Sequence, residues 1–171
     1  MPEGGALIQT SGGLRLRLRS LVGWLIPAAI VAALDQLTKE WVGASLQVGE
    51  RVTVTSFFDL VLWFNSGAAF SFLAGAGGWQ RALFVGIAVI AIVVITRLLY
   101  RHPEQMLFCA GLSLILGGAL GNLWDRVMHG HVVDFLLFHA GGYYWPAFNL
   151  ADSAITVGAG MIIIDGFRGK K

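Results

Sequence analysis

Charged residues are scarce in this chain of 171 residues. Asp, Glu, Lys and Arg make up 13% of it, against about 25% in a typical soluble domain, while apolar residues make up 56%. A soluble domain could not cover its surface with so few charges, so the composition excludes a disordered chain, a nucleic-acid-binding domain and most soluble enzymes. The net charge of +2 gives little indication of an anionic partner. The composition therefore indicates an integral membrane protein.

Cysteine is almost absent as well. The single Cys109 excludes an intramolecular disulfide and any site with several thiolates, and its place inside an apolar run indicates a small packing residue. His129, His131 and His139 lie near Asp134 in the sequence, but the pattern lacks the i, i+4 histidine pair of a zinc protease helix. We therefore expect no metal and no cofactor.

Long apolar runs are what the chain has instead. Four of them reach the roughly 20 residues that a helix needs to cross a bilayer, and they lie at about 21–41, 79–100, 105–124 and 146–164. Backbone groups in hydrocarbon must pair within their own segment, which favours helices. The first run follows a basic stretch, as in a cleaved signal peptide, but it is too long and has no clean cleavage site. We expect a retained span after a frayed tail over residues 1–20.

Basic residues lie mainly on one side of these spans. Eight of the twelve come before the first span, between the second and third, or after the fourth, which predicts that both termini, including the tail 169–171, are cytoplasmic. In the first long outer connection, residues 46–55 alternate around a Gly-Glu turn and 57–64 are rich in aromatic and β-branched residues, which predicts a small sheet within about 44–72. The predicted fold is one mainly α-helical membrane domain over 21–168, with four transmembrane helices and a small outer β-sheet.

The few polar residues of the spans gather near the outer side. Asn122 and Asp125 share a helix face at the end of the third span, and Asn149 and Asp152 share one at the start of the fourth. Asp134 lies in the connection between them. Because a charged residue in a span is costly, it is a functional candidate by default. The spacing predicts three carboxylates near one level, accompanied by asparagines that donate hydrogen bonds without adding charge.

Two of these carboxylates, brought within a few Å of each other, would share a proton. An aspartic protease uses this arrangement, because one carboxylate deprotonates water while the other donates a proton to the carbonyl oxygen. Spacing alone leaves open whether Asp125 or Asp134 is the partner of Asp152. Asp125 could instead pair with the arginine that follows it, Asp35 could pair with Lys39 at i+4, and the asparagines could simply join helices.

Two other functions fit these carboxylates less well. A proton or ion transporter would need polar residues through the whole bilayer, whereas the third span is apolar from Met106 to Leu116 except for Ser113. A rhomboid-like serine protease would need a Ser–His pair deep in two spans, and the sequence offers no convincing one. The position of the polar residues favours chemistry near the outer surface.

Five sequence blocks carry a family resemblance: DQLTK (35–39), NSGAAFSF (65–72), GGALGNLWDR (117–126), GHVVDF (130–135) and FNLADSAI (148–155). Any one block is weak, but all five in this order across four spans are specific. The chain resembles bacterial lipoprotein signal peptidase, also called signal peptidase II. The resemblance implies four transmembrane helices with a small sheet and a short helix on the extracytoplasmic face.

The same resemblance implies an intramembrane aspartic endopeptidase of the bacterial inner membrane, with its active site near the periplasmic face. Such enzymes remove signal peptides from diacylglyceryl-modified prolipoproteins, cutting before the lipidated cysteine. They take their substrate from membrane lipid, need no metal and are inhibited by the cyclic peptide globomycin. The family's catalytic pair falls on Asp134 and Asp152. Its supporting or substrate-binding residues fall on Asp35, Asn65, Asn122, Asp125, Arg126 and Asn149.

Overall fold

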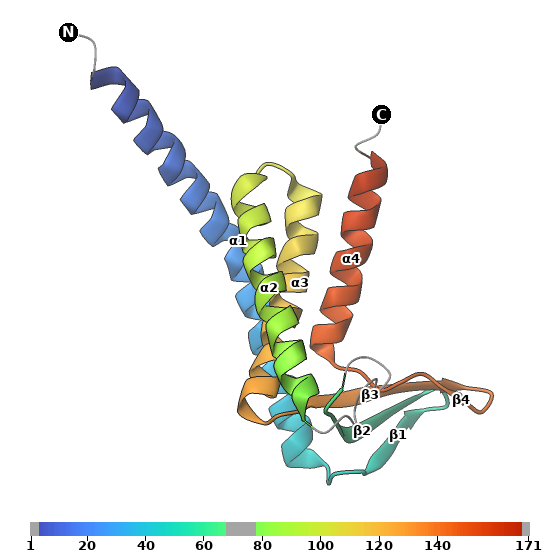
Figure 1. The fold of residues 1–171 in the computed structure, drawn as a ribbon. Coiled ribbons are helices and arrows are strands. Elements are labelled where there is room, and N and C mark those ends of the chain that lie inside the picture. Colours follow the sequence, from blue (N-terminus) through green and yellow to red (C-terminus); the bar gives the residue numbers. More distant parts are fainter. Residues whose placement is uncertain (1–3, 68–77, 169–171) are drawn as a thin grey trace.

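The computed structural model describes residues 4–67 and 78–168. These residues form four helices and four strands (Figure 1). The helices are α1 (Gly4–Ser45), α2 (Trp79–Arg101), α3 (Met106–Met128) and α4 (Leu150–Arg168), and the strands are β1 (Arg51–Thr55), β2 (Phe58–Asn65), β3 (Val132–Ala140) and β4 (Tyr143–Tyr144). Both termini and the turn between α2 and α3 lie at one end of the bundle, and the sheet lies at the other (Figure 1).

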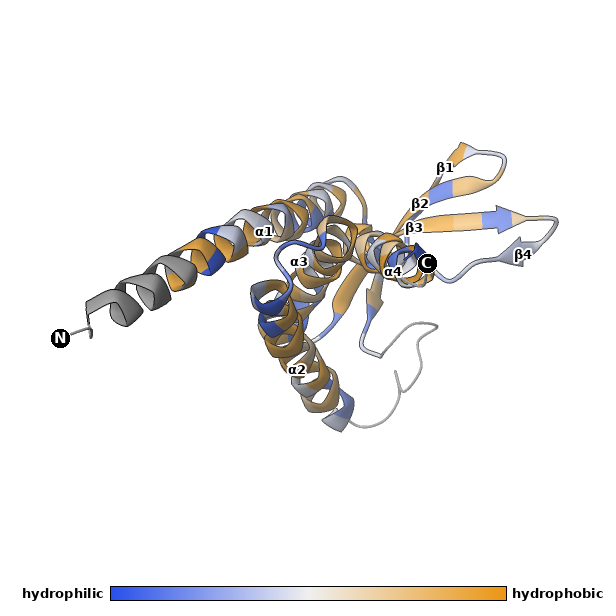
Figure 2. Ribbon diagram, turned by 90° about the horizontal axis from the view of Figure 1, so that it is seen from above, coloured by the Kyte–Doolittle hydropathy of each residue, from blue (hydrophilic) through white to orange (hydrophobic). Residues whose placement is uncertain are grey.

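All four helices are long and apolar enough to cross a membrane, which confirms the four predicted spans. Exposed apolar side chains on them include Ile90 and Val93 of α2 and Ile163 of α4. Hydrophobic residues extend along most of the described length of the helices (Figure 2). Helix α3 buries half of its most apolar window inside the protein, whereas the other three bury between 11% and 17%. The third helix is therefore the centre of the bundle, and the others pack around it.

Glycines set how closely the helices approach α3. A Cβ atom added at Gly117 would lie 2.6 Å from the carbonyl oxygen of Ala28 in α1, and one added at Gly111 would lie 2.8 Å from that of Gly158 in α4. Real Cβ atoms do not come so close to a backbone oxygen. Such small residues allow backbone-to-backbone packing, a common mode in membranes. The α3–α4 contact matters most here, because both helices carry candidate site residues at their outer ends.

The helix bounds differ from the predicted spans by four residues or more at five ends. Helix α1 ends at Ser45 and helix α4 ends at Arg168, each four residues beyond the predicted end. Helix α1 begins at Gly4, inside the predicted tail, because residues 4–20 contain no proline and include leucine and arginine, which are good helix formers. Helix α3 continues to Met128 and so includes Asp125 and Arg126. Helix α4 begins at Leu150, four residues after the predicted start at Pro146. Its first turn therefore contains Asp152.

The sheet is antiparallel throughout, with the strand order β1-β2-β3-β4. The predicted strand at 57–64 is confirmed as β2, but only the second half of the predicted strand at 46–55 is extended, as β1. The first half turns at Gly49, whose φ of 86° suits glycine, and the backbone N–H of Gln47 donates to Glu50 Oε2 at 2.7 Å. The short outer helix implied by the resemblance is not among the elements of the described residues, and residues 68–77 lie outside them.

Strands β3 and β4 were not predicted. They form a hairpin around Gly141 and Gly142, which have φ angles of 57° and 86°. Two positive φ angles at a Gly-Gly pair are typical of a type I′ hairpin turn, so this pair was the local signal for the hairpin. After the hairpin the chain returns along β3, where Phe148 and Leu136 exchange backbone hydrogen bonds of 2.8 and 3.0 Å. This return brings the residue before α4 beside Asp134.

Candidate active site

Asp152 is held at the start of α4 by the residue before the helix. The side-chain Oδ1 of Asn149 accepts the backbone N–H of Asp152 at 2.9 Å, and Asp152 Oδ2 accepts the backbone N–H of Asn149 at 3.4 Å. This reciprocal pattern resembles a capping box, which satisfies free N–H groups at a helix start. A second N–H of the first turn, that of Ala151, donates to Asp35 Oδ1 of α1 at 2.9 Å. Two helices therefore fix the position of Asp152.

Asp134 lies on β3 and is almost fully buried, with 3% of its surface exposed. Its carboxylate accepts hydrogen bonds from Asn65 Nδ2 of β2 at 3.0 Å and from Asn149 Nδ2 at 2.9 Å. Burial, followed by the charge of Asp152, raises the pKa of Asp134 to about 7. The two hydrogen bonds and the charge of Lys39 act in the opposite direction but do not outweigh burial. Near neutral pH this carboxyl group can therefore hold a proton.

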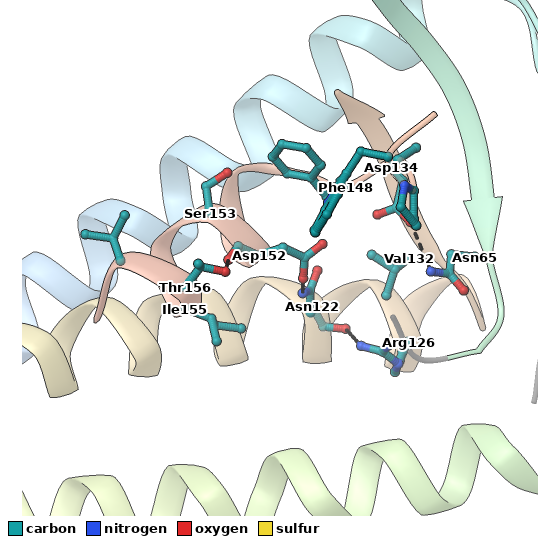
Figure 3. Close-up of a pocket in the computed structure, with 14 residues that line it drawn as sticks. Asn65, Asn122, Arg126, Val132, Asp134, Phe148, Asp152, Ser153, Ile155 and Thr156 are labelled. Carbon is teal, nitrogen blue, oxygen red and sulfur yellow. Dashed lines mark hydrogen bonds between the residues drawn. The ribbon is translucent and has the colours of Figure 1, made fainter. Parts of the chain in front are cut away.

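Two asparagines join the carboxylates of Asp134 and Asp152. Asn122 Nδ2 donates to Asp152 Oδ1 at 2.8 Å, while Asn149 Nδ2 donates to Asp134 Oδ1 and to Asn122 Oδ1, the latter at 3.2 Å. Both carboxylates line one cavity of about 560 Å³, and they face each other across it (Figure 3). The structure thus brings together the two aspartates that the resemblance selected.

A buried cluster of charges stands behind the asparagines. Lys39 Nζ of α1 lies 2.7 Å from Asp35 Oδ2, 2.8 Å from Asp125 Oδ2 and 3.0 Å from Asn122 Oδ1. Gln36 Nε2 donates to Asp125 Oδ1 at 2.9 Å. The i, i+4 pair of Asp35 and Lys39 is confirmed, but it is buried and shared with α3. In the described part of the chain, the ion-pair partner of Asp125 is Lys39 and not the arginine that follows it.

Arg126 lines the cavity beside the two carboxylates. Its Nη1 donates to the carbonyl of Asn122 at 3.3 Å, its Nη2 donates to the carbonyl of Gly67 at 3.0 Å, and its guanidinium lies 5.3 Å from the ring centre of Phe84. The buried Nε has no hydrogen-bond partner within residues 4–67 and 78–168. Arg126 therefore places a positive charge at the wall of the cavity.

The eight predicted site residues fall into two groups. Five line the cavity, and three lie behind it and hold the others. The lining residues are Asp134, Asp152, Asn65, Asn122 and Arg126, and the supporting ones are Asp35, Asp125 and Asn149. Of the block NSGAAFSF, residues 68–72 lie outside the described residues.

Sequence reasoning missed two features of the site. One is the apolar side of the cavity, which is lined by residues from β3, from the approach to α4 and from its first two turns: Val132, Trp145, Pro146, Ala147, Phe148, Ile155 and Val157. No local pattern predicts this lining, because it depends on the return of the chain along β3. The other is the hydrogen bonding of buried Lys39 and half-buried Gln36 to the residues behind the cavity, for which their place in the block DQLTK was the one available signal.

The histidines do not form a metal site with the carboxylates. Within the described residues, no three side chains of His, Cys, Asp and Glu gather as a metal site would require. His139 Nε2 lies 2.9 Å from Asp59 Oδ2, on the sheet, and the rings of His129 and His131 lie 6.1 Å apart. The carboxylates of the cavity are held by amides, which suits chemistry done by the side chains themselves.

Comparison with known proteins gives the same picture over most of the chain. A family model described as signal peptidase (SPase) II matches residues 27–168. The chain is 54% identical over 159 residues to a lipoprotein signal peptidase of Azoarcus sp. (strain BH72), covering 93% of this chain and 90% of the relative. It is 57% identical over 145 residues to one of Cupriavidus taiwanensis, covering 85% and 82%.

Two solved structures share the fold. A bacterial membrane enzyme determined by the in meso method at 2.3 Å resolution is 31% identical, with a TM-score of 0.77, and the match covers 87% of this chain and 92% of that one. A second bacterial membrane enzyme, determined at 1.9 Å resolution, is 32% identical with a TM-score of 0.72, over 83% and 90% of the two chains. The described fold is therefore that of known membrane enzymes.

Proposed function

The chain belongs to the signal peptidase II family, and on that premise we propose that it cleaves by an aspartic mechanism in which Asp134 and Asp152 are the catalytic residues. It is a multi-pass membrane peptidase that processes prolipoproteins. The finer proposal is that it takes diacylglyceryl-modified prolipoproteins and cuts just before the lipidated cysteine. The observation that carries the mechanism is the shared cavity, where two carboxylates from different elements both accept hydrogen bonds from Asn149, Asp134 from its side-chain amide and Asp152 from its backbone N–H.

The two carboxylates divide the acid and base roles. One proton is shared by the pair, and the burial of Asp134 favours finding it there. Ionised Asp152 then takes a proton from a water molecule, whose oxygen attacks the scissile carbonyl carbon, while Asp134 gives its proton to the carbonyl oxygen. The tetrahedral intermediate collapses as the C–N bond breaks. The leaving nitrogen accepts the proton that Asp152 had taken, and one hydroxyl group of the intermediate returns a proton to Asp134 as the new carbonyl forms.

The other side chains of the site bind and orient. Asn122, Asn149 and Asp125 hold the carboxylates in place. Arg126 and Asn65 line the cavity and have donors for the carbonyl groups of an extended peptide. The apolar side of the cavity suits the hydrophobic residues of a signal peptide near the cut, while the signal helix packs among the spans and the diacylglyceryl chains remain in membrane lipid.

The location follows from charge and from the shape of the molecule. We propose that the chain resides in the bacterial inner membrane with both termini cytoplasmic, because most basic residues flank the spans at the end where the termini lie (Figure 1). The sheet and the carboxylates then lie at the periplasmic end. Prolipoproteins are cut after their signal peptides have entered the membrane, so this placement suits the substrate.

A pair of matched substrates tests the proposed function. The purified chain is incubated with a diacylglyceryl-modified proform and with its unlipidated twin, and the products are measured by mass. We expect cleavage of the lipidated proform alone, with a product that begins at the modified cysteine. Equal cleavage of both substrates, or of neither, would contradict the proposal.

Two additions to the same assay test the site. Globomycin should block cleavage by occupying the cavity, and EDTA should leave it unchanged because the proposed mechanism uses no metal. An EDTA-sensitive activity that a divalent metal restores would replace the aspartic mechanism with a metal-dependent one.

A further inference from the structure

Lys39 is a buried cation that has no role in the reaction proposed above. It lies in α1, six residues before the end of the helix, and its side chain is only 3% exposed. Its three partners, Asp35, Asp125 and Asn122, come from two helices. Burying an ammonium group costs free energy even when it is paired. Lys39 is therefore a candidate for a role beyond joining α1 to α3.

The amide of Asn122 links Lys39 to the catalytic pair. Its Oδ1 accepts hydrogen bonds from Lys39 Nζ at 3.0 Å and from Asn149 Nδ2 at 3.2 Å, and its Nδ2 donates to Asp152 Oδ1 at 2.8 Å. An ammonium group can only donate. If the amide rotated by half a turn, its NH₂ would face the ammonium and its oxygen would face the Asp152 carboxylate. Lys39 thus opposes the one rearrangement that would release Asp152.

The charge of Lys39 also acts on the pair. Four carboxylates gather at this end of the bundle, two of which are in contact with Lys39, and the cations facing them are Lys39 and Arg126. On its other side Lys39 borders a groove that includes His129 and His131. The charge of Lys39 lowers the pKa of Asp134 and so partly offsets the effect of burial.

We propose that Lys39 is a positioning residue for catalysis, which orients the Asn122 amide toward Asp152 and sets the pH range in which the carboxylate pair holds a single proton. The proposal rests on the assignment of Asp134 and Asp152 as the catalytic pair. It goes beyond a purely structural role, in which Lys39 would only join α1 to α3 through Asp125. The two roles predict different pH profiles.

Three variants separate these roles. Lys39→Met removes the charge and the donor. Lys39→Met combined with Asp35→Asn removes one charge of each sign, so the net charge of the cluster returns to its original value, and the new amide oxygen can still accept the N–H of Ala151. Arg19→Met is the control, because it removes an exposed cation from the same helix, twenty residues or about 30 Å away.

The measurement is the pH profile of kcat/KM on a lipidated proform, with thermal unfolding in detergent to show that each variant is folded. Lys39→Met should lower kcat about ten- to hundred-fold and move the alkaline limb of the profile, which reports Asp134, upward by about half a unit to one unit. The double variant should return this limb toward the wild-type position while kcat stays low, because Asn122 Oδ1 has lost its ammonium donor and keeps only Asn149 Nδ2. Arg19→Met should match the wild type.

An unmoved profile in Lys39→Met, or a wild-type kcat in the double variant, would overturn the proposal and leave Lys39 a structural residue. If Lys39→Met fails to fold, kcat of the double variant decides. Failure of the mechanism itself looks different, because variants of Asp134 or Asp152 would then keep their activity whatever happens at Lys39.

Discussion

At the scale of single residues, the site depends on neutral amides placed between like charges. The side-chain amide of Asn149 donates to Asp134 and its backbone N–H donates to Asp152, while Asn122 donates to Asp152 and accepts from Asn149. An amide can donate to one carboxylate while its oxygen accepts from another donor, and it adds no charge of its own. The carboxylates of Asp134 and Asp152 are thereby held at one cavity by neutral groups, and in the proposed mechanism they share a proton.

The pKa of Asp134 predicts how activity depends on pH. Because burial and the charge of Asp152 raise this pKa to about 7, Asp134 loses its proton as the pH rises past neutrality, and the pair then lacks its acid. We expect kcat/KM on a lipidated proform to fall above about pH 7. A profile that stays flat to pH 8.5 would show that no shared proton is needed.

The same shift makes a prediction about stability. The pKa of Asp134 is higher in the folded protein, at about 7, than the ordinary aspartate value of 3.8. Its contribution to the free energy of unfolding is therefore fully present below about pH 3.8 and is lost as the pH rises through about 7. Asp134→Asn stays neutral at every pH, so the Tm of this variant in detergent should rise relative to that of the wild type between about pH 4 and 7. A constant Tm difference over this range would contradict the shift.

At the scale of elements, the contact between α3 and α4 sets the position of Asp152. A Cβ atom at Gly118 would be forced against the carbonyl oxygen of Ala151, in the first turn of α4. Gly118→Ala should therefore displace the start of α4, destabilise the protein by about 1–3 kcal/mol and lower the cleavage rate. Gly160→Ala is the matched control, because a Cβ at this glycine of α4 meets nothing within 4 Å.

Thermal unfolding and cleavage of a lipidated proform are measured for both glycine variants. If Gly118→Ala behaves like Gly160→Ala in both assays, then the close approach of the two helices is not what places Asp152.

The elements also show what could be predicted from the sequence and what could not. The spans could be predicted because the bilayer imposes a length and an apolar composition on each helix. Strand β3 could not, since VVDFLLFHA does not alternate strictly and it pairs with the distant strand β2 and with Phe148. For the same reason, residue spacing could not show whether Asp134 or Asp125 is the partner of Asp152, because this depends on how the chain returns along β3. The resemblance to the family's motifs identified Asp134.

At the scale of the whole molecule, the arrangement separates membrane anchoring from chemistry. The four helices expose apolar side chains, and the polar residues of the site gather where α3, α4 and the sheet meet. The sequence predicts that the end rich in basic residues is cytoplasmic, which stays a prediction; the first turn of α1 and the last turn of α4 lie at that end of the bundle (Figure 1). The burial of Lys39 could not be predicted, because a lysine near a helix end is ordinarily solvated.

This arrangement predicts the accessibility of single cysteines introduced into intact inner-membrane vesicles. In a Cys109→Ser background, a cysteine at exposed Tyr143, in the outer hairpin, should react with a membrane-impermeant thiol reagent only from the periplasmic face. A cysteine at exposed Phe167, near the end of α4, should react only from the cytoplasmic face. Labelling of both positions from one face would contradict the orientation.

The central claim is that Asp134 and Asp152 together activate one water molecule. It is tested most directly by the single-turnover rate at which purified Asp134→Asn and Asp152→Asn cut a diacylglyceryl-modified proform, compared with the wild type and with Asp125→Asn. We predict that both variants of the pair remain folded and lose about a thousand-fold or more in rate, while Asp125→Asn, altered behind the cavity, keeps measurable turnover. Removal of a general acid or base lowers a rate by far more than about tenfold. Cleavage by either variant of the pair at more than about a tenth of the wild-type rate would therefore contradict the account.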